Sequence, residues 1–295
     1  MSPVVLSRLF YFSSILSALL VTASMDAFAK ATASSSARSP AGTGPIIRSN
    51  SLDFAQRSVQ IKKDAVTLCS GYINAEGWVV TAAQCFKDNV RDKNFHRVTV
   101  RFGVESLGET SDREISKVIF HPKYSKDKSE NDLALVQFTG DLPSFAVKTD
   151  VLPTAFKVEK GLELSMAGFG VNPSEKLDEE KNKAGFLRRT SGLKFEKKST
   201  LNQILVQMNK ESRACHGDTG APLMVVDNGA YKVLGIVGSI SKDCGSEALL
   251  PALELAPYTP WFADVAKSKG QKGFLAYDVK VSGAKPARDV SGLRK

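Results

Sequence analysis

The chain has 295 residues, of which 42% are hydrophobic and 24% are charged, and its mean hydropathy is -0.14. These values are those of a soluble globular protein, and they exclude a disordered or a collagen-like chain. The formal net charge is +9, but residues 266–295 alone hold eight basic and two acidic side chains. The charge therefore indicates a basic C-terminal tail, and a specific nucleic-acid-binding domain is not expected.

Residues 1–29 have the pattern of a secretory signal peptide, with Arg8, an apolar run over residues 9–23, and small residues at Ala27 and Ala29. The run is short for a bilayer span and holds three serines, so we expect cleavage near Ala29 and no transmembrane segment afterwards. Residues 30–45 are rich in Ala, Ser and Gly, which predicts a linker or a pro-segment. The protein is expected to be secreted or periplasmic.

From residue 66 onward, short apolar runs rich in Val and Ile alternate with turn residues, which predicts an all-β sandwich or barrel. The runs are residues 78–82, 98–104, 115–120, 133–138, 162–167, 204–208, 223–226, 233–240 and 249–255.

Two further segments stand apart from these runs. Residues 258–267 read as a helix with Trp261, Phe262 and Val265 on one face. Residues 172–200 are polar, carry charges of both signs without an aromatic array, and are expected to be a solvated surface loop that holds Arg188-Arg189.

Four cysteines are present, and none has the spacing of a zinc site, so no metal and no cofactor are expected. In an exported chain two disulfides are favoured. Three pairings are possible, and the nearest-neighbour pairing closes two local loops; it joins Cys69 to Cys85 and Cys215 to Cys244.

Three local motifs follow one another along the chain. They are Cys69-Ser70-Gly71-Tyr72-Ile73 with Thr81-Ala82-Ala83-Gln84-Cys85, then Asn131-Asp132-Leu133-Ala134-Leu135, then Cys215-His216-Gly217-Asp218-Thr219-Gly220-Ala221-Pro222. Together they resemble the trypsin/chymotrypsin-like serine proteases, peptidase S1, in their His, Asp, Ser order. The resemblance spans residues 46–267. It implies two antiparallel six-stranded β-barrels with the site between them, a C-terminal helix, and the nearest-neighbour disulfides.

The resemblance places the catalytic triad at Gln84, Asp132 and Thr219, where the family has His, Asp and Ser. A carboxamide has no useful basicity, so it cannot take the hydroxyl proton that imidazole takes. Threonine nucleophiles act where the residue is N-terminal and its own amine is the base, whereas Thr219 lies inside the chain. We expect an inactive protease homologue; the alternative is an active serine-type endopeptidase with an atypical Thr nucleophile.

The resemblance also assigns a binding site next to the triad. The N–H groups of Gly217 and Thr219 are expected to form an oxyanion hole that can hold a carbonyl or carboxylate oxygen. Arg213 takes the place of the Asp that binds Lys or Arg in trypsins, so a trypsin-like preference is excluded. Gly238 and Ile240 line the specificity pocket, and Ile240 intrudes on a wall where the family has Gly. Arg213 either favours an acidic side chain of the ligand or fills the pocket, and we expect the filled pocket.

Asp218 matches the residue that the family pairs with a new α-amino group, made by cleavage of an inactive precursor. The nearest matching start here is Ile46, which follows Gly44-Pro45 and not Arg or Lys. We therefore do not expect this cleavage, and Asp218 is predicted to be solvated or paired elsewhere. His96, His121 and His216 are expected in surface or packing roles.

The most favoured function is binding of a protein or peptide ligand by an inactive homologue. The basic C-terminal extension, residues 268–295, is a candidate for contact with an anionic surface. Its apolar residues 274–277 are candidates for docking on the domain.

Overall fold

A computed structural model describes residues 47–48, 52–86, 97–104, 108–125, 130–171, 185–199, 202–208, 213–241, 244, 248–268 and 275–278. The predicted signal peptide, the linker and Ile46 lie outside these residues, as do residues 279–295. Within the described part, no helix has the length and apolar character needed to cross a membrane.

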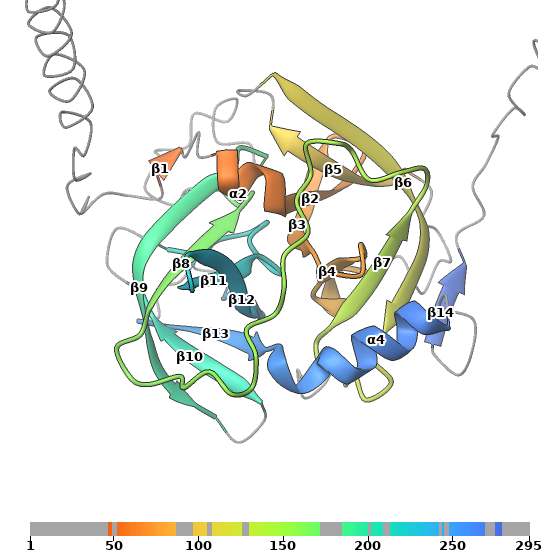
Figure 1. The fold of residues 1–295 in the computed structure, drawn as a ribbon. Coiled ribbons are helices and arrows are strands. Elements are labelled where there is room, and N and C mark those ends of the chain that lie inside the picture. The colour runs from red at the N-terminus through yellow and green to blue at the C-terminus, as the bar shows by residue number, and fades with distance from the viewer. Residues whose placement is uncertain are drawn as a thin grey trace, which may run out of the picture. The chain divides into compact units, whose positions relative to one another are not determined.

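The first barrel consists of six antiparallel strands (Figure 1). These are β2 (Ser58–Lys63), β3 (Val66–Ile73), β4 (Val79–Thr81), β5 (Val98–Val104), β6 (Glu109–Phe120) and β7 (Ala134–Phe138). Their order is β6-β5-β2-β3-β4-β7, and the pairing of β6 with β7 closes the barrel. Alternate residues face inward, so that Val59, Ile61, Val100 and Val118 meet in one apolar core.

The second barrel repeats this plan in the later half of the chain (Figure 1). Its strands are β8 (Glu163–Gly168), β9 (Arg188–Lys198), β10 (Gln203–Gln207), β11 (Pro222–Asp227), β12 (Ala230–Val237) and β13 (Leu249–Glu254). The order is β9-β10-β13-β12-β11-β8, closed by the pairing of β8 with β9. The predicted all-β class and the two six-stranded barrels are confirmed, and each of the nine apolar runs overlaps a strand.

Short elements complete the domain. Three of them come early in the chain: β1 (Ile47–Arg48), α2 (Leu52–Arg57) and the 3₁₀ turn η1 (Ala83–Phe86). The other three come at its end: η3 (Ala256–Tyr258), α4 (Thr259–Lys267) and β14 (Leu275–Asp278). The predicted C-terminal helix is confirmed as α4, which buries Trp261, Phe262 and Val265. Residues 275–278 of the predicted extension pair with β6, so this part of the extension is a strand of the first sheet (Figure 1).

The expected surface loop over residues 172–200 is wrong for its second half. Residues 188–198 form β9, which pairs with β1, β8 and β10. Its first inward-facing residues are Arg188 and Thr190, which are 1% and 3% exposed. Because these buried positions are polar, the strand lacks the alternating hydrophobicity by which strands are recognised in a sequence.

A third apolar cluster lies outside both barrel interiors and joins the two barrels. It combines Tyr72 and Leu135 of the first barrel with Met224 and Val233 of the second, and Phe262 of α4 also contributes. The two barrels therefore share a packed interface, which fixes the loops of one relative to those of the other.

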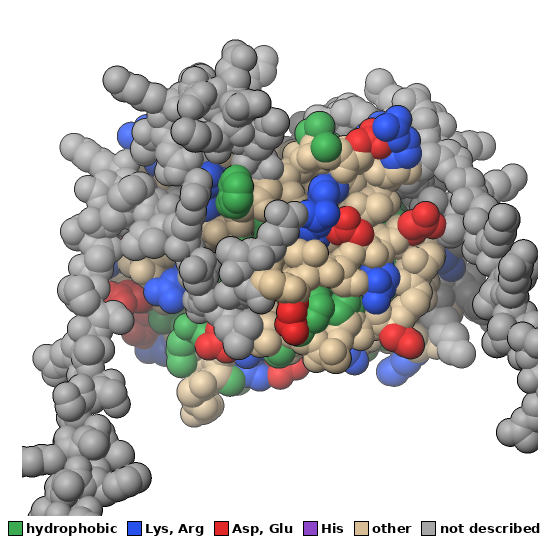
Figure 2. Space-filling view, turned by 90° about the horizontal axis from the view of Figure 1, so that it is seen from above, with side chains coloured by type: hydrophobic (Ala, Val, Ile, Leu, Met, Phe, Trp, Pro, Cys, Tyr) green, Lys and Arg blue, Asp and Glu red, His purple; other side chains and the backbone are tan. Residues whose placement is uncertain are grey.

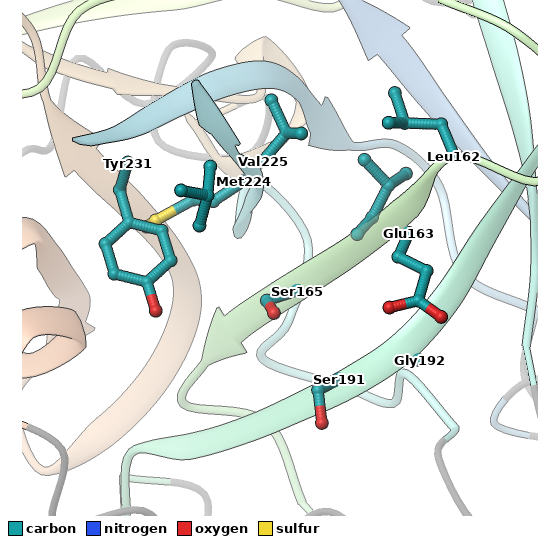
Figure 3. A pocket seen from close by; sticks show the side chains of 10 residues that line it. Leu162, Glu163, Ser165, Ser191, Gly192, Met224, Val225 and Tyr231 are labelled. Carbon is teal, nitrogen blue, oxygen red and sulfur yellow. The ribbon is translucent and has the colours of Figure 1, made fainter. Parts of the chain in front are cut away.

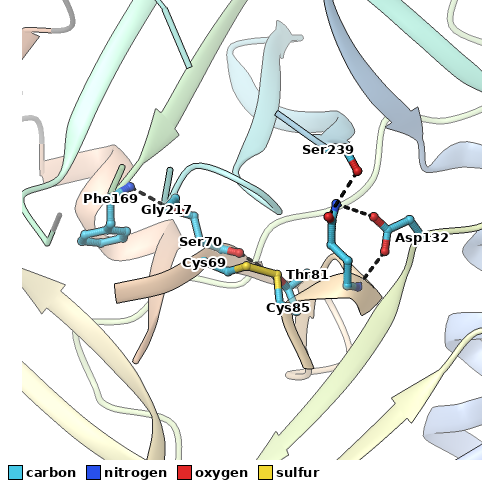
Figure 4. Close-up of a disulfide and its surroundings, with 9 residues drawn as sticks. Cys69, Ser70, Thr81, Cys85, Asp132, Phe169, Gly217 and Ser239 are labelled. Carbon is cyan, nitrogen blue, oxygen red and sulfur yellow. Dashed lines mark hydrogen bonds between the residues drawn. A yellow bond between two sulfur atoms is a disulfide. The ribbon is translucent and has the colours of Figure 1, made fainter. Parts of the chain in front are cut away.

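Both nearest-neighbour disulfides are confirmed, with Cα–Cα distances of 6.1 Å for Cys69–Cys85 and 4.4 Å for Cys215–Cys244. The first joins β3 to η1, which carries Gln84 (Figure 4). The second anchors the loop that precedes Thr219.

Candidate functional site

Gln84 and Asp132 lie together at one end of the first barrel. Gln84 is in η1, and Asp132 lies two residues before the start of β7. The backbone N–H of Gln84 donates to Asp132 Oδ1 at 2.8 Å, and its side-chain Nε2 donates to Oδ2 at 2.7 Å. Both oxygens of this buried carboxylate are therefore engaged by one residue.

The other end of the Gln84 amide is also engaged. Ser239, which follows β12, donates its hydroxyl hydrogen to Gln84 Oε1 at 3.2 Å (Figure 4). The opposite amide orientation would set Oε1 against a carboxylate oxygen, two acceptors with no proton between them. In the described part of the chain, no hydrogen bond joins Gln84 to Thr219.

The loop that carries Thr219 is held across the barrel interface by Ser70 of β3. The Ser70 N–H donates to the carbonyl of Thr219 at 2.9 Å, and its hydroxyl donates to the carbonyl of Gly217 at 2.8 Å. That hydroxyl also accepts the N–H of Phe169 at 2.9 Å (Figure 4). Ser70 belongs to the first sequence motif, but the sequence does not indicate its role, because its partner Gly217 lies 147 residues away.

The N–H groups of Gly217 and Thr219 make no hydrogen bond to any residue that the structure describes. Gly217 has φ +98°, and a Cβ there would lie 2.9 Å from the Cα of Gly170, so the turn requires glycine. Two unpaired donors on one turn can receive a carbonyl or carboxylate oxygen from a ligand.

Asp218, between these two donors, is fully buried and points into the second barrel. Its Oδ1 accepts the N–H of Gly170 at 2.7 Å, and its Oδ2 accepts the N–H of Cys215 at 3.0 Å. Burial raises the pKa of this carboxyl group to about 6, although both hydrogen bonds and the charge of Arg188 act in the opposite direction. The expected solvation of Asp218 is wrong, because the residue is buried; two backbone N–H groups hold its carboxyl group instead.

Of the residues expected at the specificity pocket, Ile240 has apolar surroundings. It packs against the core cluster of the second barrel, which includes Ala214, next in sequence to Arg213. The Gly238 N–H donates to the carbonyl of Pro251 at 3.0 Å and thereby ties this wall to β13.

The histidines that the structure describes do not lie at the triad. The ring of His121 makes edge contacts with Tyr258 and Trp261, each with ring centroids 5.0 Å apart, and burial lowers the pKa of His121. His96 lies outside the described residues.

One cluster has the residue types of a metal site. His216 lies with Cys215 and Cys244, and their ligand atoms are within 4.8 Å of one another. Both sulfurs are joined in a disulfide, so neither is the thiolate that a metal needs, and this cluster does not fit a metal ion.

A surface pocket of about 310 Å³ lies elsewhere, between strands β8, β9 and β11 of the second barrel (Figure 3). Ser165, Ser191, Met224 and Tyr231 are among its lining residues. None of the triad or oxyanion-hole residues lines it, so it is separate from the candidate site.

A family model, curated relatives and solved structures all point to one family of known proteins. The family model described as Trypsin matches residues 48–262. Rat granzyme M is 30% identical over 223 residues, which cover 70% of this chain and 83% of that protein. CLIP domain-containing serine protease B4 of Anopheles gambiae is 26% identical, with 66% of this chain and 61% of that protein covered.

The chain thus spans less than two thirds of the mosquito relative. Among solved structures, a mutant of human heparin binding protein has the same fold, with a TM-score of 0.60 and 20% identity over 74% of this chain and 94% of that chain. With the family model matching well over half of its length, the chain belongs to the trypsin family of serine proteases and their homologues.

Proposed function

We propose that this protein is a catalytically inactive trypsin-family homologue that acts by binding a protein or peptide. The observation that carries the proposal is the placement of the Gln84 amide, whose nitrogen is held by Asp132 and whose oxygen is held by Ser239. A protease needs a base that takes the proton from the nucleophile and returns it to the leaving amine. The amide has no such basicity and no hydrogen bond to Thr219.

Loss of one triad residue costs about 10⁴ to 10⁶ in turnover in this type of enzyme. The alternative, an active endopeptidase that uses Thr219, must overcome this loss without a base. The observation that remains in favour of the endopeptidase is the pair of N–H donors at Gly217 and Thr219. These donors can bind an oxygen equally well in a binding protein.

The deciding experiment is incubation of the purified protein with a fluorophosphonate probe, followed by intact-mass measurement. We expect no adduct, as in a Thr219→Ala control. Trypsin, treated in parallel, should be fully labelled. A stoichiometric adduct on Thr219 that the Ala variant lacks would contradict inactivity and favour the endopeptidase.

We further propose that the ligand places a carbonyl or carboxylate oxygen at Gly217 and Thr219. A filled pocket at Arg213, which the packing of Ile240 against the core of the second barrel supports, favours contact with the ligand backbone over a deep side-chain pocket. An NMR titration with an N-acetylated tetrapeptide carrying a free C-terminal carboxylate tests this: the amide signals of Gly217 and Thr219 should shift together and saturate. Unchanged signals for these two amides would contradict the proposed ligand chemistry.

Export is part of the proposal. The signal-peptide pattern of residues 1–29 and the two disulfides support it, since disulfides persist in oxidising compartments. The test is the mass of the protein recovered outside the cytoplasm, which should begin at Lys30. A structural neighbour is named a heparin binding protein, so a polyanion is the class of ligand to test for the basic extension.

A further inference from the structure

The carboxyl group of Asp218 occupies space that two glycines leave open. A Cβ at Gly168 would lie 2.2 Å from Asp218 Oδ1, and a Cβ at Gly170 would lie 2.3 Å from Oδ2. Both distances are far below van der Waals contact, so any other residue at either position would displace the carboxyl group. With the N–H groups of Gly170 and Cys215 on its two oxygens, the surroundings are shaped for this one group.

Arg188 of β9 lies on the same side of the sheet. It is the ladder partner of Gly168, and paired residues of antiparallel strands extend their side chains to the same face. Because the missing Cβ of Gly168 would point at Asp218, the side chain of Arg188 extends toward Asp218 as well. Its Nη1 donates to the carbonyl of Gly170, the residue whose N–H is bonded to Asp218.

Arg188 and Asp218 are each 1% exposed. A guanidinium keeps its charge in the protein interior, and burying it is costly unless an anion lies close by. The same holds for a carboxylate, and the charge of Arg188 acts to lower the pKa of Asp218. Each group thus offsets the cost of burying the other.

We propose that Arg188 is the positioning residue that holds residues 215–219 in place in the uncleaved chain, by supplying the cation for Asp218. The family resemblance assigns this task to an α-amino group made by cleavage. Here the cation belongs to β9, so the Gly217 and Thr219 donors are presented without a new chain end. The described residues next to the position that matches the family's cleavage point, Ile47 and Arg48, are themselves paired with β9 as a strand.

The inference deepens the proposed function, since it makes the ligand-binding donors permanently available. It rests on the proposed function only in assigning ligand binding to the Gly217 and Thr219 N–H groups, because its test examines the loop without a ligand. The role of Arg188 can therefore be confirmed while ligand binding fails, and ligand binding can be confirmed while the role of Arg188 fails.

The test uses the full protein, shown by intact mass to be uncut through residues 44–48. Amide hydrogen exchange of Gly170 and Cys215, measured by NMR, should be slow in the wild type. Arg188→Gln should accelerate both amides at least tenfold, and Arg188→Lys should restore most of the protection. Titration of the Asp218 carboxyl carbon should have a higher midpoint in Arg188→Gln, an effect that a purely packing role would not produce.

Arg189→Gln is the matched control. It removes the same charge from the next residue of β9, whose guanidinium lies 5.0 Å from the ring centroid of Phe54. This variant should leave the exchange of both amides and the titration of Asp218 unchanged.

The double variant Arg188→Gln, Asp218→Asn covers the case in which Arg188→Gln alone does not fold. Because it leaves no buried charge unpaired, it should be folded and should lose less protection than the sum of the two single changes. Additive effects, rapid exchange of Gly170 and Cys215 in the uncut wild type, or an unchanged Asp218 titration in Arg188→Gln would overturn the proposal.

Discussion

Gln84 stands where the family has its acid-base histidine; it fits the site, but its amide has no atom basic enough to take a proton. Asp132 accepts two hydrogen bonds from Gln84, as it could accept one from an imidazole. The double variant Gln84→His, Thr219→Ser should nevertheless cleave casein at least about a hundredfold more slowly than trypsin, because we expect Ile240 to fill the space for a substrate side chain.

Addition of Ile240→Gly to that double variant should raise the rate of casein cleavage. If the double variant alone cleaves casein as fast as trypsin does, the filled-pocket interpretation is wrong.

Asp218 makes the stability of the domain depend on pH. Its pKa in the folded protein, about 6, is above the ordinary value of 3.8, so the folded state holds the proton more tightly than the unfolded state. Its contribution to stability is complete only at a pH well below 3.8 and is lost as the pH rises through 6, a total of about 3 kcal/mol.

Urea unfolding from pH 4 to pH 7 measures this effect. The free energy of unfolding of the wild type should fall over this range by about 2 kcal/mol more than that of Asp218→Asn, which cannot titrate. Parallel pH profiles for the two proteins would contradict the assignment.

Individual site residues were predictable where a local motif carries them. Gln84, Asp132 and Thr219 each stand in such a motif, and so do the four cysteines. The roles of Ser70 and Arg188 were not predictable, because each acts through a partner on a distant strand. Ser70 bonds to Gly217 of the other barrel, and Arg188 donates to the carbonyl of Gly170, whose N–H is bonded to Asp218.

Among the elements, strands with apolar inward faces were found from the sequence, and those with polar inward faces were missed. Residues 98–104 alternate in the manner of a half-buried strand and form β5. In β9, the inward positions begin with Arg188 and Thr190, so its charge density suggested a solvated loop. The polar residues that hide this strand are the ones that build the Asp218 site.

Strand β14 pairs with the end of β6 that β5 does not cover. β5 pairs with β6 as far as Glu114, and β14 pairs with residues Lys117 to Phe120. A chain that ends at Ser268 should therefore expose backbone groups of β6 to water. We expect it to be about 1–2 kcal/mol less stable to urea than the full chain.

Hydrogen exchange locates this loss. In the shortened chain, the amides of residues 117–120 that are not bonded to β7 should exchange faster, whereas a chain that ends at Asp278 should keep the full-length pattern. Identical exchange in both shortened chains would show that β14 does not contribute to the sheet.

At the scale of the whole molecule, the residues that the structure describes carry acidic and basic side chains in similar numbers. Acidic and basic side chains are interspersed on the face in Figure 2. Several are paired: Arg101 with Asp112 at 2.7 Å, and Lys232 with Asp150 at 2.6 Å. The Arg101 hydrogen bond lowers the pKa of Asp112. Such pairs leave little field around the body, so attraction to an anionic partner is expected to come from the extension.

Deletion of residues 279–295 tests this distribution while keeping β14. The segment holds five basic residues and one acidic residue, and a basic side chain near an anionic membrane contributes about 1 kcal/mol. The full protein should sediment with vesicles that contain phosphatidylglycerol at low salt, and the deletion should weaken this binding at least tenfold. A full-length variant with the five basic residues changed to Gln should behave like the deletion, because charge and not length drives the contact. Equal binding by all three proteins would place the contact on the body of the domain instead. Binding that persists in 1 M salt, where the screening length is about 3 Å, would show that charge does not drive the contact.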